Sequence, residues 1–131
     1  MQLVNPPELG RPRGFSHGVL APAGARTLYV AGQTAAGADG RVAAAEFAAQ
    51  FEASLDRVLR VVRAAGGAPE HVTRMTIFVT DLDAYRASRA ALGEVWRRQM
   101  GAHYPAMALV QVSGLVDAGA TVEIQADAAL P

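Results

Sequence analysis

The chain has 131 residues, a length that suits one domain with one hydrophobic core. Twelve basic residues balance twelve acidic residues, so the formal net charge is zero. No basic run is interleaved with aromatic residues, which argues against a nucleic-acid partner. Because there is no cysteine, the composition excludes disulfides, a thiolate nucleophile and a cysteine-based metal site.

Other classes of site and location are also disfavoured by sequence pattern. No apolar stretch approaches the ~20 residues needed to cross a bilayer, and the first ten residues lack the features of a signal peptide. We therefore expect a cytoplasmic protein with no membrane partner. No two histidines stand at ligand spacing, and the glycines at 32, 37 and 40 do not form a phosphate-binding loop. The sequence indicates neither a metal nor another cofactor.

The N-terminal part combines breaker residues with two short strand patterns. Residues 1–13 are rich in proline and are expected to form an irregular arm. Residues 15–20 alternate loosely between polar and apolar and end at a turn signal over residues 21–24. Residues 27–31 are β-branched and aromatic, so this segment and the preceding one are predicted to pair as a hairpin.

The strongest periodic segment is a helix predicted over residues 44–65. Apolar residues recur at the spacing of one helical face, at Phe47, Phe51, Leu55, Val58, Leu59 and Val62. The opposite, polar side carries Glu46, Gln50, Glu52, Asp56, Arg57, Arg60 and Arg63. Gly66 and Gly67 are expected to end the helix, and Pro69 prevents its resumption.

A strand over residues 73–80 and a second helix follow. Asp81 and Asp83 suit the start of that helix, which extends to about Met100. Its inner face would use Tyr85, Leu92, Val95, Trp96 and Met100. Gly93 lies inside the helix at a cost of about 1 kcal/mol relative to alanine, and tight packing is one reason for such a glycine.

The final two segments, residues 103–112 and 120–126, both alternate with period two, and Asp117-Ala118-Gly119 is predicted to turn one into the other as a hairpin. On one face this pairing places Ala108, Val110 and Val112 with Val122, Ile124 and Ala126. On the other it places Met107, Leu109 and Gln111 with Thr121, Glu123 and Gln125. A carboxylate between uncharged polar side chains, on a strand with an apolar reverse face, makes Glu123 the leading candidate for a functional residue.

The element order is therefore β-β-α-β-α-β-β, an α+β arrangement with one mixed sheet and two helices on one face. Both sides of the central strands carry apolar residues: Phe78 lies opposite Ile77, and Met107 and Leu109 lie opposite Val110. Two helices cover only one of these sides, and monomers avoid large exposed apolar patches. We expect a homo-oligomer that packs sheet faces together.

Several motifs resemble the RidA (YjgF-type) family in their order and spacing. They are Gly14-Phe15-Ser16-His17, Leu28-Tyr29-Val30-Ala31-Gly32-Gln33, Ala64-Ala65-Gly66, Thr76-Ile77-Phe78-Val79-Thr80-Asp81-Leu82, Tyr104-Pro105-Ala106 and Val122-Glu123-Ile124. The resemblance covers about residues 14–128. It implies a single RidA-like domain over residues 1–131 with a chorismate-mutase-like fold. It also implies a homotrimer whose sheets form a central barrel, with small-molecule ligands in clefts between subunits.

The better-known members of that family hydrolyse reactive enamines and imines to ammonia and a keto acid. Their Pro-Ala-Arg motif holds the substrate carboxylate, but this chain has Met107 in place of the arginine. A thioether offers neither the charge nor the donors of a guanidinium. The family's cleft asparagine, tyrosine and cysteine fall at Arg89, Phe15 and Leu109, and only the strand carboxylate matches, at Glu123. The resemblance implies a divergent member with an altered substrate preference.

Each candidate site residue has a functional and an ordinary structural interpretation. Glu123 is the candidate general acid or base, and the alternative is a carboxylate satisfied by backbone donors or by an arginine of a neighbouring subunit. The candidate ligand contacts are Met107, Leu109, Phe15, His17, Arg89, Gly32 and Tyr104. The ordinary alternatives are apolar core for Met107 and Leu109, solvent for Arg89, and a structural position for His17 and His103. His71 follows a helix stop and is expected at the surface.

Two functions remain open at this level. One is a hydrolase or deaminase that acts on an imine, enamine or related metabolite in an inter-subunit cleft. The other is a non-catalytic ligand-binding or regulatory trimer of the same fold. Some family members have been labelled ribonucleases, and the neutral charge and missing basic stripe argue against that activity here.

Overall fold

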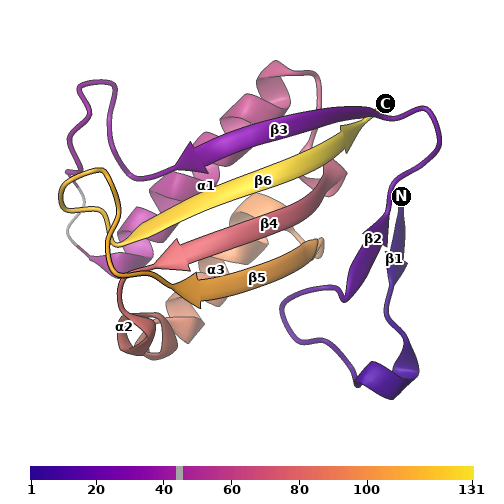
Figure 1. Ribbon diagram of the computed structural model, residues 1–131, viewed down its shortest axis with the longest axis horizontal. Helices are drawn as coiled ribbons and strands as arrows, with labels where there is room; N and C mark the ends of the chain where they lie inside the picture. The colour runs from indigo at the N-terminus through magenta and orange to yellow at the C-terminus, as the bar shows by residue number, and fades with distance from the viewer. Residues whose placement is uncertain (44–45) are drawn as a thin grey trace.

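The computed structural model describes residues 1–43 and 46–131 and has two layers (Figure 1). One layer is a four-stranded sheet in the order β3-β6-β4-β5, formed by β3 (Arg26–Gln33), β4 (Val72–Val79), β5 (Ala106–Gln111) and β6 (Val122–Leu130). The other contains helices α1 (Phe47–Ala64), α2 (Leu82–Ala87) and α3 (Arg89–Met100). None of the helices in these described ranges is long and apolar enough to cross a membrane.

Strand pairing confirms the predicted crossovers and overturns both predicted hairpins. β6 is antiparallel to β3 and to β4, and β5 runs parallel to β4 at the edge of the sheet. Each strand–helix–strand connection therefore joins strands that run in the same direction. β2 (Gly18–Leu20) pairs with β1 (Gln2–Val4) instead of β3, and β5 does not pair with β6 within the described residues.

The predicted final hairpin does not form, because β6 pairs with two other strands. The turn predicted at Asp117 does form, since the Ala120 N–H donates to the Asp117 carbonyl oxygen at 3.1 Å. The connection then leads the chain past β4 to the centre of the sheet, where β6 forms ladders on both of its edges. A turn signal specifies a local reversal, but it does not specify which strand lies alongside.

The N-terminal arm is more ordered than the irregular segment that the sequence suggested. It contains β1 and a single 3-10 turn at Pro7–Leu9. Figure 1 shows β1 and β2 together at one side of the four-stranded sheet. Ser16 ties the arm to the body: its N–H donates to the Pro105 carbonyl oxygen at 3.0 Å, and its hydroxyl donates to the Tyr104 carbonyl oxygen at 2.6 Å.

Helix α1 confirms the predicted apolar face. Its six predicted inward residues are buried: Phe47, Phe51, Leu55, Val58, Leu59 and Val62. The predicted start at Ala44 lies outside the described residues. Gly66, with φ of +86°, ends the helix as expected. Gln50 departs from its predicted polar side: it is 1% exposed, donates to the Gly119 carbonyl oxygen at 3.1 Å and accepts from the Thr121 N–H at 2.9 Å.

The second predicted helix is divided at Ser88 into α2 and α3. Asp81 caps α2 as predicted, because its carboxylate accepts hydrogen bonds from the N–H groups of Asp83 and Ala84. The predicted inner face is buried at Leu92, Val95, Trp96 and Met100, whereas Tyr85 is only half-buried. Tight packing does not explain Gly93, since a Cβ at this position would meet no atom within 4 Å.

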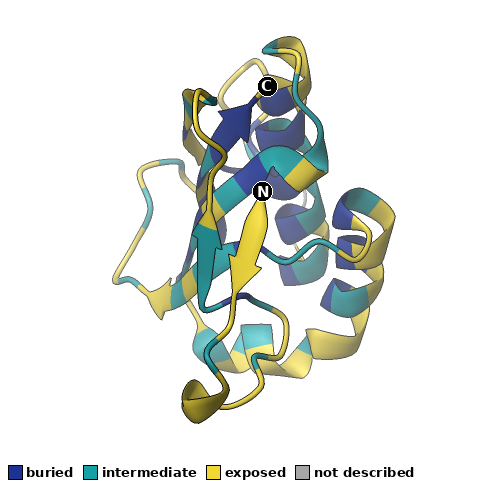
Figure 2. Ribbon diagram, turned by 90° about the vertical axis from the view of Figure 1, so that its right-hand side faces the viewer, coloured by how far each residue is buried: buried dark blue, intermediate teal, exposed yellow. Residues whose placement is uncertain are grey.

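The helices cover one face of the sheet and leave the other face open. Figure 2 shows the buried residues concentrated between the sheet and the helices. The register pairs Ile77 with Leu109 and Phe78 with Val110, so Met107 and Leu109 lie on the helix side. Ala108 and Val110 lie on the open face with Glu123. The prediction of which β5 side chains share a face with Glu123 was wrong. β5 is apolar at both sets of alternate positions, so only its pairing with β4 decides which set turns toward the helices.

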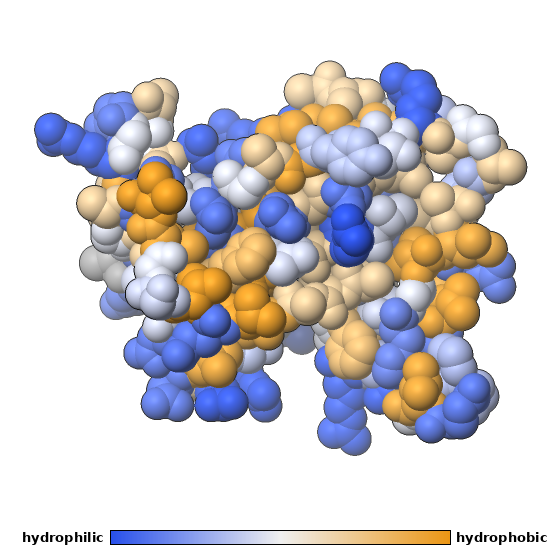
Figure 3. Space-filling view, in the orientation of Figure 1, coloured by the Kyte–Doolittle hydropathy of each residue, from blue (hydrophilic) through white to orange (hydrophobic). Residues whose placement is uncertain are grey.

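The open face mixes apolar and charged side chains. Tyr29 and Val110 on this face are 76% and 42% exposed, and Phe78 is half-buried between them in the sheet. Arg74, Glu123, Gln125 and Asp127 interrupt them. Figure 3 views this face, with hydrophobic patches separated by hydrophilic ones. The uncovered face is present as predicted. Its apolar surface on β5 comes from Val110, whereas Met107 and Leu109 lie on the other side of the sheet.

Candidate functional site

Four strands each contribute one residue to a row across the open face: Gly32, Glu123, Phe78 and Val110. The register aligns Glu123 with Phe78 and Phe78 with Val110. Glu123 is half-buried, and no hydrogen bond to its carboxylate forms within the described residues. This carboxylate is therefore not satisfied by backbone donors in the described chain, and its oxygens are available to accept hydrogen bonds from a ligand.

Gly32 is needed for the position of that carboxylate. β3 has one extra residue between Val30 and Gln33 relative to β6, so a bulge lies beside Glu123. A Cβ at Gly32 would lie 2.8 Å from Cδ of Glu123 and 3.1 Å from its Oε2. The glycine thus allows the glutamate side chain to lie directly against β3. The structure brings together these two predicted site residues.

A pocket of about 200 Å³ lies on the opposite, helix-covered side of the sheet. We call it the aromatic pocket, and it is lined by Gly14, Phe51, Ile77, Tyr85, Arg89, Leu92, Gly93, Trp96, Tyr104, Met107 and Leu109. The floor is buried at Phe51, Ile77, Leu92 and Trp96, whereas Arg89 is exposed. The predicted residues Met107, Leu109, Arg89 and Tyr104 therefore meet in one cavity, which is walled mainly by carbon.

Two ring contacts hold the walls of the aromatic pocket. Trp96 stacks on Tyr104 with ring centroids 5.5 Å apart and planes 7° apart, and its indole N–H donates to the His103 carbonyl oxygen at 3.0 Å. The Arg89 guanidinium lies over the Tyr85 ring, 5.8 Å from its centroid. Arg89 forms no salt bridge with the described acidic residues. Its positive charge stands beside the otherwise uncharged lining.

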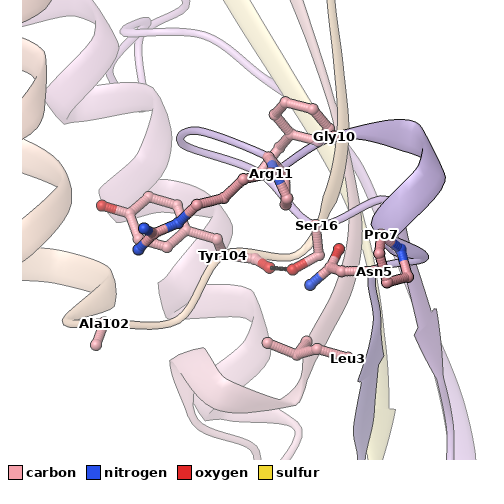
Figure 4. Close-up of a pocket in the computed structure, with 10 residues that line it drawn as sticks. Leu3, Asn5, Pro7, Gly10, Arg11, Ser16, Ala102 and Tyr104 are labelled. Carbon is pink, nitrogen blue, oxygen red and sulfur yellow. Dashed lines mark hydrogen bonds between the residues drawn. The ribbon is translucent and has the colours of Figure 1, made fainter.

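Phe15 and His17 follow the N-terminal arm, and they line neither the open-face row nor the aromatic pocket. The His17 ring contacts the Gly10 carbonyl oxygen at 3.0 Å through Nε2 and packs edge-on against Phe15 at 5.2 Å. Phe15 lines a separate cavity of about 570 Å³ between the arm and the body. Figure 4 shows this cavity, with Leu3 and Pro7 from the arm and Tyr104 from the body. Tyr104 borders both cavities, whereas His17 lines neither of them.

The other histidines also have structural partners. His103 Nε2 lies 2.7 Å from the Val72 carbonyl oxygen, and His71 Nδ1 accepts a hydrogen bond from the Ala68 N–H at 2.9 Å. His71 is half-buried rather than fully at the surface. Across the residues that the structure describes, no three histidine, cysteine or acidic side chains gather where they could hold a metal ion.

The structure thus places Glu123 and Gly32 on one face of the sheet and Met107, Leu109, Arg89 and Tyr104 on the other, with Phe15 and His17 in neither group. Sequence reasoning did not include Tyr85, Gly93 and Trp96 among the ligand contacts. For Gly93 and Trp96 the available signal was their spacing from Arg89 on one side of α3, at i+4 and i+7. On sequence grounds, Trp96 is assigned to the inner face of the helix and Gly93 to tight packing, and only Arg89 to the ligand contacts.

The fold and its cavities define an α+β protein with one open sheet face and an apolar pocket beside an edge strand. The chain matches the family model described as Endoribonuclease L-PSP over residues 10–130. It belongs to this family, which is the RidA (YjgF-type) family that its motifs resemble.

Solved structures show the same fold. A conserved Rid family protein, YyfB from Yersinia pestis, is 31% identical, with 98% of each chain covered and a TM-score of 0.84. E. coli TdcF, solved with bound serine, is 28% identical, with 93% of this chain and 92% of that chain covered and a TM-score of 0.68. The curated protein DfrA from Myxococcus xanthus is 41% identical over 78 residues, which span 60% of this chain and 56% of DfrA.

Proposed function

We propose that this protein hydrolyses a small imine or enamine in clefts between the subunits of a homotrimer. The observation that carries the proposal is the division of the site between the two faces of one sheet. A carboxylate on the open face reaches a ligand in the aromatic pocket only if the two belong to different subunits. The uncovered sheet face, with Tyr29 and Val110 exposed, supports such an assembly.

In the proposed reaction, Glu123 moves the protons. Water adds to the carbon of the protonated imine as Glu123 accepts a proton from it, which forms a neutral carbinolamine. Protonated Glu123 then returns that proton to nitrogen. The C–N bond breaks, ammonia leaves, and the hydroxyl proton passes back to the Glu123 carboxylate as the carbonyl forms. An enamine is first protonated on carbon to give the imine. One water is consumed and one ammonia released, so no oxidant or reductant is required.

The second candidate is a non-catalytic binding module of the same fold. Met107 favours it, because this side chain lines the aromatic pocket at the position where the family motif has its carboxylate-binding arginine. A pocket with this lining can bind an apolar group of a ligand. At the position of Met107 it offers no cation to the carboxylate of that ligand. TdcF, the related protein solved with bound serine, supports binding of a small amino-acid-like ligand by this fold.

Ammonia release distinguishes the two functions. Imines are generated freshly from alanine, leucine and phenylalanine with an amino-acid oxidase, and ammonia is followed with wild type and with Glu123→Gln. We expect wild type to accelerate release and the variant to lose about 100-fold or more of that acceleration, the size of a general acid–base contribution. Gln125→Ala, two residues along the same face of β6, is the matched control and should retain activity.

Two results would contradict the proposal. If wild type accelerates release from none of the three imines, the hydrolase interpretation is wrong and the binding module is favoured. If Glu123→Gln is as active as wild type, the carboxylate does not carry the proton.

A further inference from the structure

We infer that the aromatic pocket is a specificity pocket for an aromatic ring or a branched aliphatic group on the ligand, and that Gly93 provides the room for it. The inference deepens the proposed function, on which it rests for its catalytic consequence. Binding to the pocket is measured without turnover, so the two ideas are tested separately.

The size and lining of the pocket indicate the chemistry of this group. Met107 and Leu109 form the wall on the sheet side, and the stacked Trp96 and Tyr104 rings form another. The volume is about 200 Å³. An apolar cavity of about 150 Å³ is known to take a benzene molecule, so the space suits one ring or a branched chain of similar size. A methyl group would leave most of it unfilled.

Gly93 is unusual because nothing in the fold requires a glycine there. It lies within α3, where glycine costs about 1 kcal/mol relative to alanine. Its φ is not positive, and a Cβ would meet no atom within 4 Å. Gly93 shares the pocket-facing side of the helix with Arg89 and Trp96. The absent side chain therefore corresponds to open volume in the pocket, which a larger residue would occupy.

The walls around this volume are held in place before any ligand binds. The Trp96 indole is fixed by its hydrogen bond to the His103 carbonyl oxygen and by stacking on Tyr104. A wall with few alternative rotamers loses little entropy when it binds a flat group. At the rim, the exposed Arg89 provides a positive charge beside which an acidic end of the ligand can lie.

The experiment uses Trp96 as its probe, because it is the chain's single tryptophan. The full-length protein is titrated with phenylacetate and with acetate, which differ by the ring, and tryptophan fluorescence and binding heat are recorded. We expect phenylacetate to bind saturably, with acetate at least about tenfold weaker. Gly93→Leu should weaken phenylacetate binding at least about tenfold by filling the pocket. Ala91→Leu, the same side chain at an exposed position of α3, should not.

Equal binding of acetate and phenylacetate would overturn the inference. Binding of phenylacetate by Gly93→Leu within about twofold of wild type would also overturn it. Circular dichroism and a second variant, Gly93→Ala, show whether any loss reflects unfolding, since a single methyl group fits the open space.

Failure of the proposed function gives a different pattern. If Gly93→Leu abolishes phenylacetate binding and no imine is hydrolysed, the pocket inference stands and the catalytic proposal is wrong. If imines from alanine and phenylalanine are hydrolysed at equal rates and Gly93→Leu changes neither rate, the catalytic proposal stands and the pocket inference is wrong.

Discussion

Glu123 and Gly32 depend on one another across two adjacent strands. The glutamate side chain lies so close to β3 that a Cβ at residue 32 would be only 2.8 Å from Cδ of Glu123. The bulge in β3 brings Gly32 to this point. Bulges often re-aim a side chain near a functional site, and here the glycine determines how closely the carboxylate approaches β3.

Gly32→Ala should therefore reduce ammonia release more than it reduces stability. We expect kcat to fall by about 10- to 100-fold, because a displacement of about 1 Å in a reacting group costs up to about 100-fold. The glutamate side chain can rotate away, so the unfolding free energy should change by less than about 1 kcal/mol. Steady-state kinetics and urea unfolding measure the two effects.

The control for this substitution is Gly114→Ala, where an added Cβ meets no atom within 4 Å and the φ is not positive. It should leave both quantities unchanged. A Gly32→Ala variant with normal kcat would mean that the carboxylate position does not limit the reaction.

At the scale of elements, two glycines beside helices have opposite reasons to be glycine. Gly67 follows α1, and a Cβ there would lie 2.5 Å from Leu130 Cδ2 and 3.1 Å from the Val62 carbonyl oxygen. It allows the end of α1 to approach the end of β6 closely. Gly93 has no such neighbour, so helix α3 is less stable than its length and packing allow.

Alanine at these two positions should change stability in opposite directions. Gly67→Ala should lower the unfolding free energy by about 1–3 kcal/mol through overpacking. Gly93→Ala should raise it by up to about 1 kcal/mol through helix propensity. Urea unfolding at one fixed protein concentration provides the comparison, since assembly would make the midpoint depend on concentration. Shifts of the same sign would contradict the packing difference between the two sites.

At the scale of the whole molecule, the open sheet face is the feature that points to assembly. The helices bury Met75, Ile77, Val79 and Ile124 on their side of the sheet. The other face leaves Tyr29 76% exposed and Val110 42% exposed beside Glu123 and Phe78. If copies associate through this face, the carboxylate row of one subunit is brought toward the neighbouring subunits.

Val110→Asp should therefore dissociate the assembly without unfolding the chain. We expect wild type to sediment at about three times the 13.7 kDa of one chain and the variant as a single chain. The reason is that a charge is tolerated at a position exposed in one subunit but is costly when it is buried in an interface. Sedimentation velocity at micromolar concentration measures the result.

Val61→Asp is the matched control, because Val61 is 37% exposed on the helix layer, away from the open face. This variant should sediment like wild type. A wild-type protein that sediments as one chain would contradict the composite site, since Glu123 and the aromatic pocket would then never meet.

Local patterns in the sequence were sufficient for several elements. The apolar spacing of α1, the Asp81 cap of α2 and the left-handed Gly66 after α1 all match the structure. Each depends on contacts within a few residues along the chain, where periodicity and capping chemistry carry the information. The family motifs named Glu123 and Gly32 as candidate site residues, and the structure places the two side by side.

Only the tertiary structure decided how the strands pair and what each face contains. β5 is apolar at both alternate sets of positions, so its pattern is compatible with either orientation, and parallel pairing with β4 turns Met107 and Leu109 toward the helices. The aromatic pocket depends on the distance between α3 and β5, which no local pattern specifies. The sequence by itself determined most of the long elements and the family because these depend on short-range preferences. The pairing of the strands, and with it the separation of Glu123 from the pocket, depends on hydrogen bonds between residues far apart in the chain.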